Sequence, residues 1–327
     1  MDQEENHKRN QKALRNLNPK TVGLTWSTKG VYRCKLLWLI RKTIGWYYKK
    51  KLMAHNTRAL LASIFKLLSS ILKLMEIVGF IPARLASTRF YGKVLHPIEG
   101  LPMIEHVRRR ALLSKGLKDV YVATSDMEIY NLVSSCGGKV ILTHLEHENG
   151  TSRIAEAVQK VACSHVVLIQ GDEPLILPNH IDKLIDSINQ FPNIDAWNCV
   201  ASLSSVDELN KQSFVKCITS PENFILNTFR RSPLISRQEI QMAQIKKVLG
   251  ILGFKKEFLL SLSLLPQSML EANESIEQLR IIENHFRLSA VHVEPALPSI
   301  NEPKDLQVVI DNIKTDTIQS QLFKKIK

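Results

Sequence analysis

The stretch from Val78 to Lys93 reads Val-Gly-Phe-Ile-Pro-Ala-Arg-Leu-Ala-Ser-Thr-Arg-Phe-Tyr-Gly-Lys, and an apolar strand here runs directly into a polar loop. The loop carries three cations and two hydroxyl groups, from Arg84, Ser87, Thr88, Arg89 and Lys93. Guanidinium and ammonium groups offer charge and donors to phosphate oxygens, and Gly92 lets the backbone approach an anion closely. The stretch therefore predicts a triphosphate site at the end of a buried strand. Its spacing differs from the Gly-x-x-x-x-Gly-Lys-Ser/Thr phosphate loop, which disfavours an ordinary ATPase or GTPase.

Apolar runs alternate with helical periodicity from residue 76 onward. We expect strands at 77–81, 120–123, 140–142 and 166–169, and helices at 103–113, 129–135, 154–161 and 180–188. This alternation predicts an α/β fold, a three-layer, Rossmann-like and mostly parallel sheet covered on both faces. Ligands of such sheets bind beyond the carboxyl ends of the strands, where the following polar residues fall: Arg84, Asp126, His144 and Asp172.

The second half of the chain is less regular. Strands are expected at 196–200, 214–218 and 224–229, and these predict a smaller mixed-strand portion that extends the sheet with antiparallel pairs. A helix at 275–284, a strand at 289–293 and a last helix at 303–314 follow.

Asp172 follows the apolar run from residue 165 to 169 and is expected to emerge at a strand end in the same crevice as the phosphate loop. A carboxylate at that place suits Mg²⁺. The alternative is that Asp172 and Glu173 only cap the turn before Pro174.

The 327 residues suffice for one large domain or two smaller ones, and 44% hydrophobic residues with 23% charged residues are typical of a globular protein. The charge is unevenly distributed: residues 1–76 hold 16 Lys and Arg against 4 Asp and Glu, a net charge of +12, whereas the remainder carries +1. The basic isoelectric point thus belongs to the N-terminal segment. Five scattered cysteines without a Cys-x-x-Cys pair favour reduced thiols over disulfides or a zinc site.

Residues 1–75 form a basic, amphipathic and aromatic extension ahead of a domain at 76–327. Lys66 and Lys73 interrupt its most apolar window, so no transmembrane helix is predicted, and the position of the apolar run argues against a signal peptide. The pattern also fits a helix on an anionic membrane surface or a nucleic-acid contact. We favour a tail without catalytic role, or a start codon assigned too far upstream, over membrane contact, and expect no nucleic-acid partner.

Several motifs in a fixed order resemble one known family. After the opening stretch come Gly92-Lys93, Pro102-Met103-Ile104, Val122-Ala123-Thr124, Gly150-Thr151 with Arg153-Ile154-Ala155-Glu156, Gln170-Gly171-Asp172-Glu173-Pro174 and Glu277-Gln278-Leu279-Arg280. Together they resemble the CMP-sugar-acid synthetases, most closely the 3-deoxy-manno-octulosonate (Kdo) cytidylyltransferases, over residues 76 to about 313.

The resemblance implies a nucleotidyltransferase fold and transfer of CMP from CTP to Kdo, with release of pyrophosphate, for lipopolysaccharide biosynthesis. It further implies a Mg²⁺ cofactor, a cytoplasmic location, a homodimer, and a sugar-binding role for the mixed-strand portion. Two alternatives stay open: CMP activation of a related keto-sugar acid, sialic-acid-like or amino-modified, and a catalytically impaired nucleotide-binding paralogue.

The family's functional residues carry over by motif. The catalytic residues would be Arg84, Lys93 and Asp172, and the nucleotide would contact Ala83, Arg84, Ser87, Arg89, Lys93, Thr124, Gly150, Thr151, Arg153, Gln170 and Gly171. The sugar would contact Arg231, Glu277 and Gln278, and the metal would be held by Asp172 and Asn301.

The chain departs from the family's pattern around the same pocket. Asn301 stands where an aspartate is usual, which predicts weaker Mg²⁺ binding because one negative charge is lost. Ser152 and Ser125 likewise replace acidic residues, and Val248 and Leu252 replace a polar His and Tyr. The lost hydrogen-bonding side chains would weaken binding of a polyhydroxylated acid or favour a less polar one.

Overall fold

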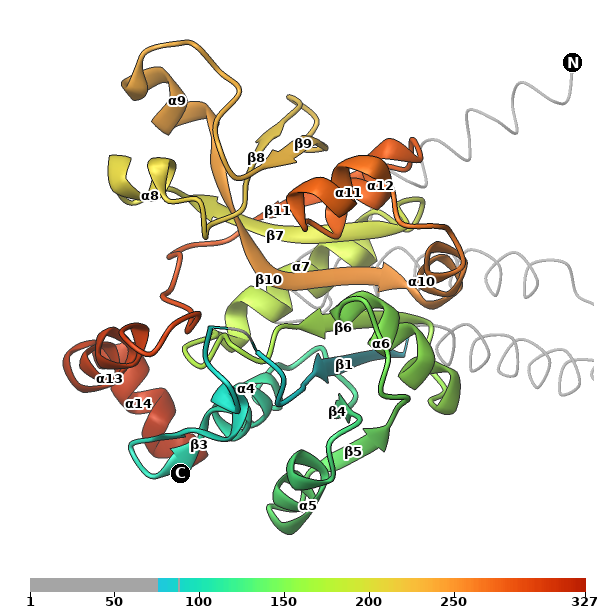
Figure 1. Ribbon diagram of the computed structural model, residues 1–327, viewed down its shortest axis with the longest axis vertical. Coiled ribbons are helices and arrows are strands. Elements are labelled where there is room, and N and C mark those ends of the chain that lie inside the picture. The colour runs from blue at the N-terminus through green and yellow to red at the C-terminus, as the bar shows by residue number, and fades with distance from the viewer. Residues whose placement is uncertain (1–75, 88) are drawn as a thin grey trace, which may run out of the picture. The chain divides into compact units, whose positions relative to one another are not determined.

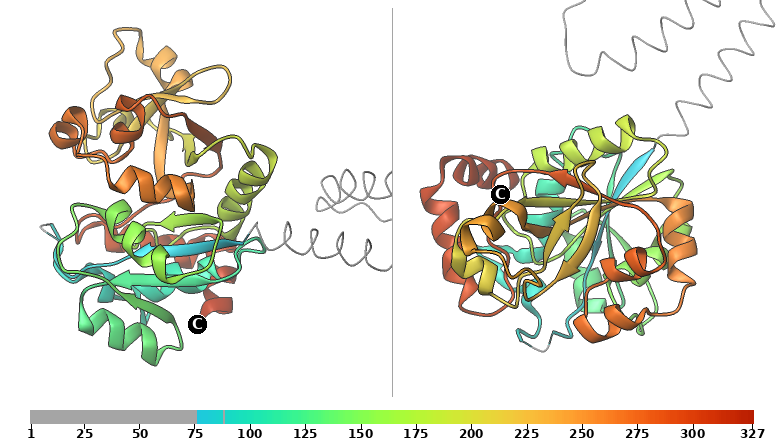
Figure 2. Two further views of the ribbon diagram at one scale, coloured as in Figure 1. Left: turned by 90° about the vertical axis from the view of Figure 1, so that its right-hand side faces the viewer. Right: turned by 90° about the horizontal axis from the view of Figure 1, so that it is seen from above.

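The computed structural model describes residues 76–87 and 89–327, so the predictions for residues 1–75 lie outside the described residues. The described chain is an α/β unit with helices on both faces of one sheet (Figures 1 and 2). Strand order in the main path is β11-β7-β10-β6-β1-β4-β5. The predicted fold class is confirmed.

The parallel half of the sheet contains β1 (Ile77–Pro82), β4 (Val120–Thr124), β5 (Lys139–Leu142) and β6 (His165–Ile169). Strand β1 lies between β4 and β6 and is parallel to both. Its side chains alternate with the pleat: Ile77 and Ile81 enter one core cluster, whereas Val78 and Phe80 enter the other. A strand buried on both faces explains why the sequence here is a continuous apolar run.

Helices cover the two faces separately. One cluster packs the sheet against α4 (Met103–Ala111), α5 (Met127–Ser135) and α7 (Pro178–Gln190). The opposite cluster includes α6 (Gly150–Ala157), α10 (Lys256–Ser263) and α12 (Gln278–Glu283). The predicted helices of the first half are therefore present, with ends displaced by a few residues.

Strand β10 (Lys246–Lys255), which the sequence pattern did not predict, joins the two halves of the sheet. It pairs antiparallel with β6, with β7 (Ala196–Ser202) and with β8 (Lys216–Thr219). Gly250 and Gly253 interrupt its apolar pattern, and glycine weakens the strand signal of a sequence. The glycine at 250 is required by close approach, since a Cβ there would lie 2.8 Å from Gln170 Cβ.

The remaining strands are β9 (Ile225–Phe229), antiparallel to β8, and β11 (Leu288–His292), parallel to β7. Short strands β2 (Pro97–Ile98) and β3 (Leu101–Pro102) form a separate hairpin. Together with α8 (Val206–Asn210) and α9 (Gln238–Gln244), β8 and β9 project from one end of the sheet (Figure 2). The predicted antiparallel extension is thus confirmed.

The C-terminal helices differ from the prediction. The helix expected at 275–284 is shorter in the structure, where α12 spans Gln278–Glu283. Ser275 does not belong to it, because this residue ends the preceding helix α11 (Met269–Glu274) in the left-handed conformation, with φ 53°. The helix expected at 303–314 is α13 (Asp305–Thr315), but it is followed by α14 (Thr317–Ile326), whose first turn Asp316 caps. Among residues 76–87 and 89–327, no helix has the length and apolar character needed to cross a membrane.

Candidate active site

The phosphate loop, residues 83–93, leaves the carboxyl end of β1. It is closed on itself by a hydrogen bond from Gly92 N–H to Leu85 O, 2.9 Å long. Gly92 has φ 66°, the left-handed conformation that glycine adopts without steric cost. The predicted strand-to-loop transition therefore ends in a compact turn that leaves Arg84 and Arg89 exposed.

A cavity of about 820 Å³ opens beside this loop. Its wall brings together most of the predicted site residues: Ala83, Arg84, Ser87, Arg89, Lys93, Gly150, Arg153, Gln170, Gly171, Asp172 and Glu277. These side chains come from the ends of β1 and β6, from the start of α6 and from the segment before α12. The cavity lies where ligands of open α/β sheets bind.

Lys93 and Asp172, which both line the cavity, form an ion pair with 2.6 Å between Lys93 Nζ and Asp172 Oδ2. Lys93 Nζ also donates to Ile300 O at 2.9 Å, and Ile300 N–H donates to Asp172 O at 3.0 Å. Segment 299–301 is thereby held against the end of β6. The two predicted metal ligands, Asp172 and Asn301, consequently belong to neighbouring segments.

Asn301 does not line the cavity, but its side-chain oxygen accepts a hydrogen bond from Arg89 Nη2 at 3.4 Å. Its backbone N–H donates to Asp305 Oδ2 at 2.9 Å, which orients it at the start of α13. Both predicted metal ligands thus present an oxygen toward a cation of the phosphate loop.

Arg153 is almost fully buried on α6 and faces the cavity. It donates to Thr143 Oγ1 at 2.6 Å and to His144 O at 3.3 Å. Burial lowers the pKa of Arg153, although a guanidinium retains its charge at neutral pH. Arg153 therefore adds a fixed cation to one wall.

Glu156 lies one turn beyond Arg153 and accepts hydrogen bonds from His147 Nε2 and His144 Nδ1, at 2.8 and 3.0 Å. Burial alone would raise the pKa of Glu156, but a hydrogen bond from the His144 backbone N–H, together with the two from the histidine side chains, brings it below its usual value. His147, which itself lines the cavity, is held in place by this carboxylate.

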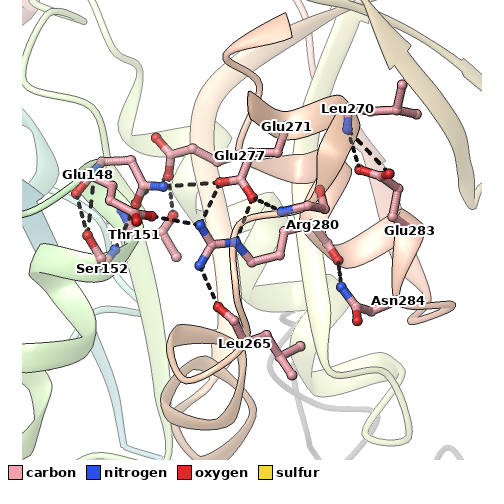
Figure 3. A network of polar contacts seen from close by, with 12 residues as sticks. Glu148, Thr151, Ser152, Leu265, Leu270, Glu271, Glu277, Arg280, Glu283 and Asn284 are labelled. Atoms are coloured by element: carbon pink, nitrogen blue, oxygen red, sulfur yellow. Dashed lines mark hydrogen bonds and ion pairs between the residues drawn. The ribbon is translucent and has the colours of Figure 1, made fainter. Parts of the chain in front are cut away.

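Part of the cavity wall is acidic, because Glu148, Glu271 and Glu277 all line it (Figure 3). Glu277 accepts hydrogen bonds from Thr151 N–H, at 3.1 Å, and from the Thr151 hydroxyl, and so covers the start of α6. Burial raises the pKa of Glu277, which these hydrogen bonds partly offset. The predicted nucleotide contact Thr151 is thus bonded to a predicted sugar contact.

A buried ion pair supports this wall. Arg280 Nε lies 2.6 Å from Glu271 Oε2, and Arg280 Nη2 lies 2.9 Å from Glu148 Oε2 (Figure 3). Glu271 also accepts from Asn149 Nδ2 at 3.3 Å. Helices α11 and α12 are thereby tied to the loop that precedes α6.

Comparison with known proteins gives the family of this chain. The family model described as cytidylyltransferase matches residues 78–288, which contain both the phosphate loop and Asp172. This chain belongs to the cytidylyltransferase family.

Relatives within the cytidylyltransferase family agree with the motif resemblance. The chain is 33% identical over 251 residues to 3-deoxy-manno-octulosonate cytidylyltransferase of Geobacter sulfurreducens, covering 73% of this chain and 100% of the relative. It is 34% identical over 246 residues to 8-amino-3,8-dideoxy-manno-octulosonate cytidylyltransferase of Shewanella halifaxensis, covering 74% and 100%. A solved CMP:2-keto-3-deoxy-manno-octonic acid synthetase complexed with CTP superposes with a TM-score of 0.69 at 33% identity, covering 74% of this chain and 99% of the other.

Four predicted residues of this cytidylyltransferase lie outside the cavity wall, in addition to Asn301. Thr124 is fully buried, and Thr151 faces Glu277. Arg231 is exposed on the segment after β9, and Gln278 Nε2 donates to Asn198 Oδ1 at 2.8 Å. Their contacts with substrate stay predictions.

Other residues around the site were not predicted to contact the substrates or the metal. Arg230, next to Arg231, donates to Glu274 O and Ser275 O at 2.9 and 3.2 Å and so fixes the turn between α11 and α12. Glu173 accepts from Gly250 N–H at 3.4 Å, and burial together with Asp172 raises the pKa of Glu173 to about 7. The position of Glu271 could have been predicted from the sequence, because Ser268-x-x-Glu271 is a capping-box pattern and the capping box is present at the start of α11.

Proposed function

We propose that this chain transfers CMP from CTP to 3-deoxy-manno-octulosonate and releases pyrophosphate, as a cytoplasmic step of lipopolysaccharide biosynthesis. The observation that carries the proposal is that one cavity is lined by the cationic phosphate loop, by the Lys93–Asp172 pair and by the carboxylate of Glu277. The names of the relatives supply the sugar.

In this reaction the anomeric hydroxyl oxygen forms a bond to the α-phosphorus of CTP and loses its proton, while the bond between the α-phosphorus and the bridging oxygen breaks. Negative charge accumulates on the pyrophosphate that leaves. Arg84, Arg89 and Lys93 are arranged to neutralise that charge, and fixed cations in a partly enclosed site do so without reorganising.

The donor set also fits Mg²⁺. Asp172 and Asn301 offer a carboxylate and an amide oxygen from adjacent segments, and Mg²⁺ prefers oxygen ligands completed by substrate phosphates. When bound, the ion would withdraw charge from the triphosphate. Lys93 Nζ donates a hydrogen bond to one carboxylate oxygen of Asp172. If that oxygen held the metal, Lys93 would be available to contact the phosphates.

The decisive test supplies the full chain with Mg²⁺ and Kdo and compares CTP, UTP and ATP, following pyrophosphate and identifying the product by mass spectrometry. CMP-Kdo formed only with CTP is the expected result. CTP binding without turnover would favour the impaired paralogue, and turnover with another acid would move the proposal to that sugar.

An amino-modified sugar is the second candidate. Three carboxylates, those of Glu148, Glu271 and Glu277, line the cavity, and Arg280 pairs with two of them. An excess of negative charge would favour an ammonium group on the sugar. Competition between Kdo and its 8-amino analogue at fixed CTP distinguishes the two candidates. Preference for the analogue would identify the amino-modified sugar, rather than Kdo, as the substrate.

The homodimer is also a proposal. The projecting region exposes Leu226, Ile235 and Ile240, which contact between two copies would cover. Light scattering should give twice the chain mass for the wild type, and a lower mass at equal concentration for Ile235→Ser; a monomeric wild type would refute the dimer.

A further inference from the structure

Asp126 occupies the residue before α5, where an aspartate ordinarily caps the helix that follows it. Its backbone is extended, with φ −93° and ψ 120°, as a capping residue requires. Yet its side chain makes no capping hydrogen bond to α5. The carboxylate of Asp126 is therefore directed to another part of the molecule.

The carboxylate reaches the phosphate loop. Asp126 Oδ2 accepts a hydrogen bond from Leu85 N–H, 2.9 Å long, across 41 residues of sequence. Asp126 N–H in turn donates to Thr124 Oγ1 at 3.0 Å, and Thr124 is fully buried at the end of β4. The end of β4 thus holds the Asp126 backbone in place, and the Asp126 carboxylate holds the loop.

Leu85 is the point at which the loop is held. Its N–H donates a hydrogen bond to Asp126, its carbonyl accepts one from Gly92 N–H, and the residue is only 9% exposed. The neighbouring residue Arg84 and nearby Ser87 both line the cavity. Fixing Leu85 therefore sets the position of the groups on either side of it.

Asp126 also affects the electrostatics of the cavity. Arg84 and Arg153 line the same cavity. Burial and the charge of Arg84 both lower the pKa of Arg153, whereas the charge of Asp126 raises it. The carboxylate thus moderates repulsion between two guanidinium groups that would both face a nucleotide.

We propose that Asp126 is a positioning residue for the nucleotide: through Leu85 it holds the phosphate loop in its binding-competent shape before CTP arrives. This inference rests on the proposed function in taking CTP as the loop's ligand. A preformed loop costs less ordering on binding, so the benefit is measured as CTP affinity.

The test uses the full chain in two measurements that need neither sugar nor turnover. Hydrogen–deuterium exchange reports protection of the Leu85 amide, and calorimetry with Mg²⁺ reports the Kd for CTP. Asp126→Ala should speed exchange at residues 84–93 and raise the Kd about 10-fold, the equivalent of one lost hydrogen bond to a charged group. Asp126→Asn keeps an acceptor oxygen and should restore most of both properties.

Glu128→Ala is the matched control, because it removes the same charge from the exposed side of the same helix and should change neither measurement. Thr124→Val, which removes only the hydroxyl that orients Asp126, should give a smaller change in the same direction. Unchanged exchange in Asp126→Ala overturns the anchor, and faster exchange with an unchanged Kd overturns its role in binding. If the wild type binds CTP but does not transfer CMP to Kdo, the proposed function fails while this test stays readable.

Discussion

Lys93 Nζ lies 2.6 Å from Asp172 Oδ2, so the cation of the phosphate loop is already paired with the carboxylate at the end of β6. The pair is largely shielded from solvent, with the Lys93 side chain 14% exposed and that of Asp172 26% exposed. Lys93 also holds Ile300 O, so one ammonium group links three segments of the site. In the proposed reaction a triphosphate and Mg²⁺ would exchange these partners, so we expect substitutions of Lys93 and Asp172 to affect each other.

The first prediction follows from that coupling. Lys93→Met keeps the length of the side chain but removes its charge, and should lower kcat about 100-fold, as loss of one fixed charge-stabilising donor does. Lys93→Arg should retain more activity, since it keeps the charge but places it differently. Steady-state kinetics with CTP and Kdo measure both. Lys115→Met, at an exposed lysine after α4, is the control, and an equal loss there would refute a specific role for Lys93.

The second prediction concerns the buried pair of Glu271 and Arg280, whose side chains are 3% and 7% exposed. Glu271→Gln leaves the guanidinium with only the more exposed Glu148 as a charged partner. We expect the free energy of unfolding to fall by about 3 kcal/mol, the usual cost of removing one member of a buried pair. Urea denaturation measures the change. Breaking the exposed pair of Lys118 and Glu76 by Lys118→Gln should cost less than about 1 kcal/mol, and similar losses in the two variants would show that burial is not the cause.

The phosphate loop could be predicted from the sequence because its groups are contiguous. Residues 78–93 contain the strand, the turn glycine and the cations in a single stretch. The contacts that hold this loop could not be predicted in that way. Asp126 reaches Leu85 across 41 residues and Asn149 reaches Glu271 across 122 residues, and such pairs are defined only by the tertiary fold.

The same distinction explains the errors in the fold. The parallel strands are continuous apolar runs with a clear pattern. Strand β10 instead contains two glycines, which lie against Gln170 and the side chains of α7. Packing against these neighbours, rather than a local sequence pattern, makes this segment a strand. Helix α14 likewise packs by tertiary contacts, with Arg110 Nη1 donating to Gln319 Oε1 at 2.7 Å.

The third prediction concerns the predicted metal ligand Asn301. Asn301→Asp adds a carboxylate to segment 299–301, which is held beside Asp172, and should tighten divalent-cation binding about 10-fold, an effect of about 1.4 kcal/mol. Titration with Mn²⁺ in the presence of CTP, followed by electron paramagnetic resonance, measures this without turnover. Asn179→Asp, exposed in the first turn of α7, is the matched control. Equal Mn²⁺ affinity in the wild type and Asn301→Asp would remove residue 301 from the metal site.

The last prediction concerns Glu173, whose pKa is raised from 4.5 to about 7 by burial and by Asp172. Between pH 4.5 and 7 the folded protein retains a proton that the unfolded chain releases, so this residue makes the free energy of unfolding fall as pH rises through that window. The full effect would be about 3 kcal/mol. Glu173→Gln is neutral at every pH and should lack this contribution.

Two buried histidines change the free energy of unfolding with pH in the opposite direction, so the effect of Glu173 must be measured as a difference between two proteins. Burial lowers the pKa values of His106 and His165 to about 4, so their contribution to stability is lost as pH falls from 6.5 toward 4. The wild-type curve alone mixes both trends. Urea denaturation of metal-free wild type and Glu173→Gln from pH 5 to 8 isolates Glu173 as the difference between the two curves. We expect the variant to gain stability relative to the wild type as pH rises to 7, and a constant difference would show that Glu173 is not protonated in the folded protein.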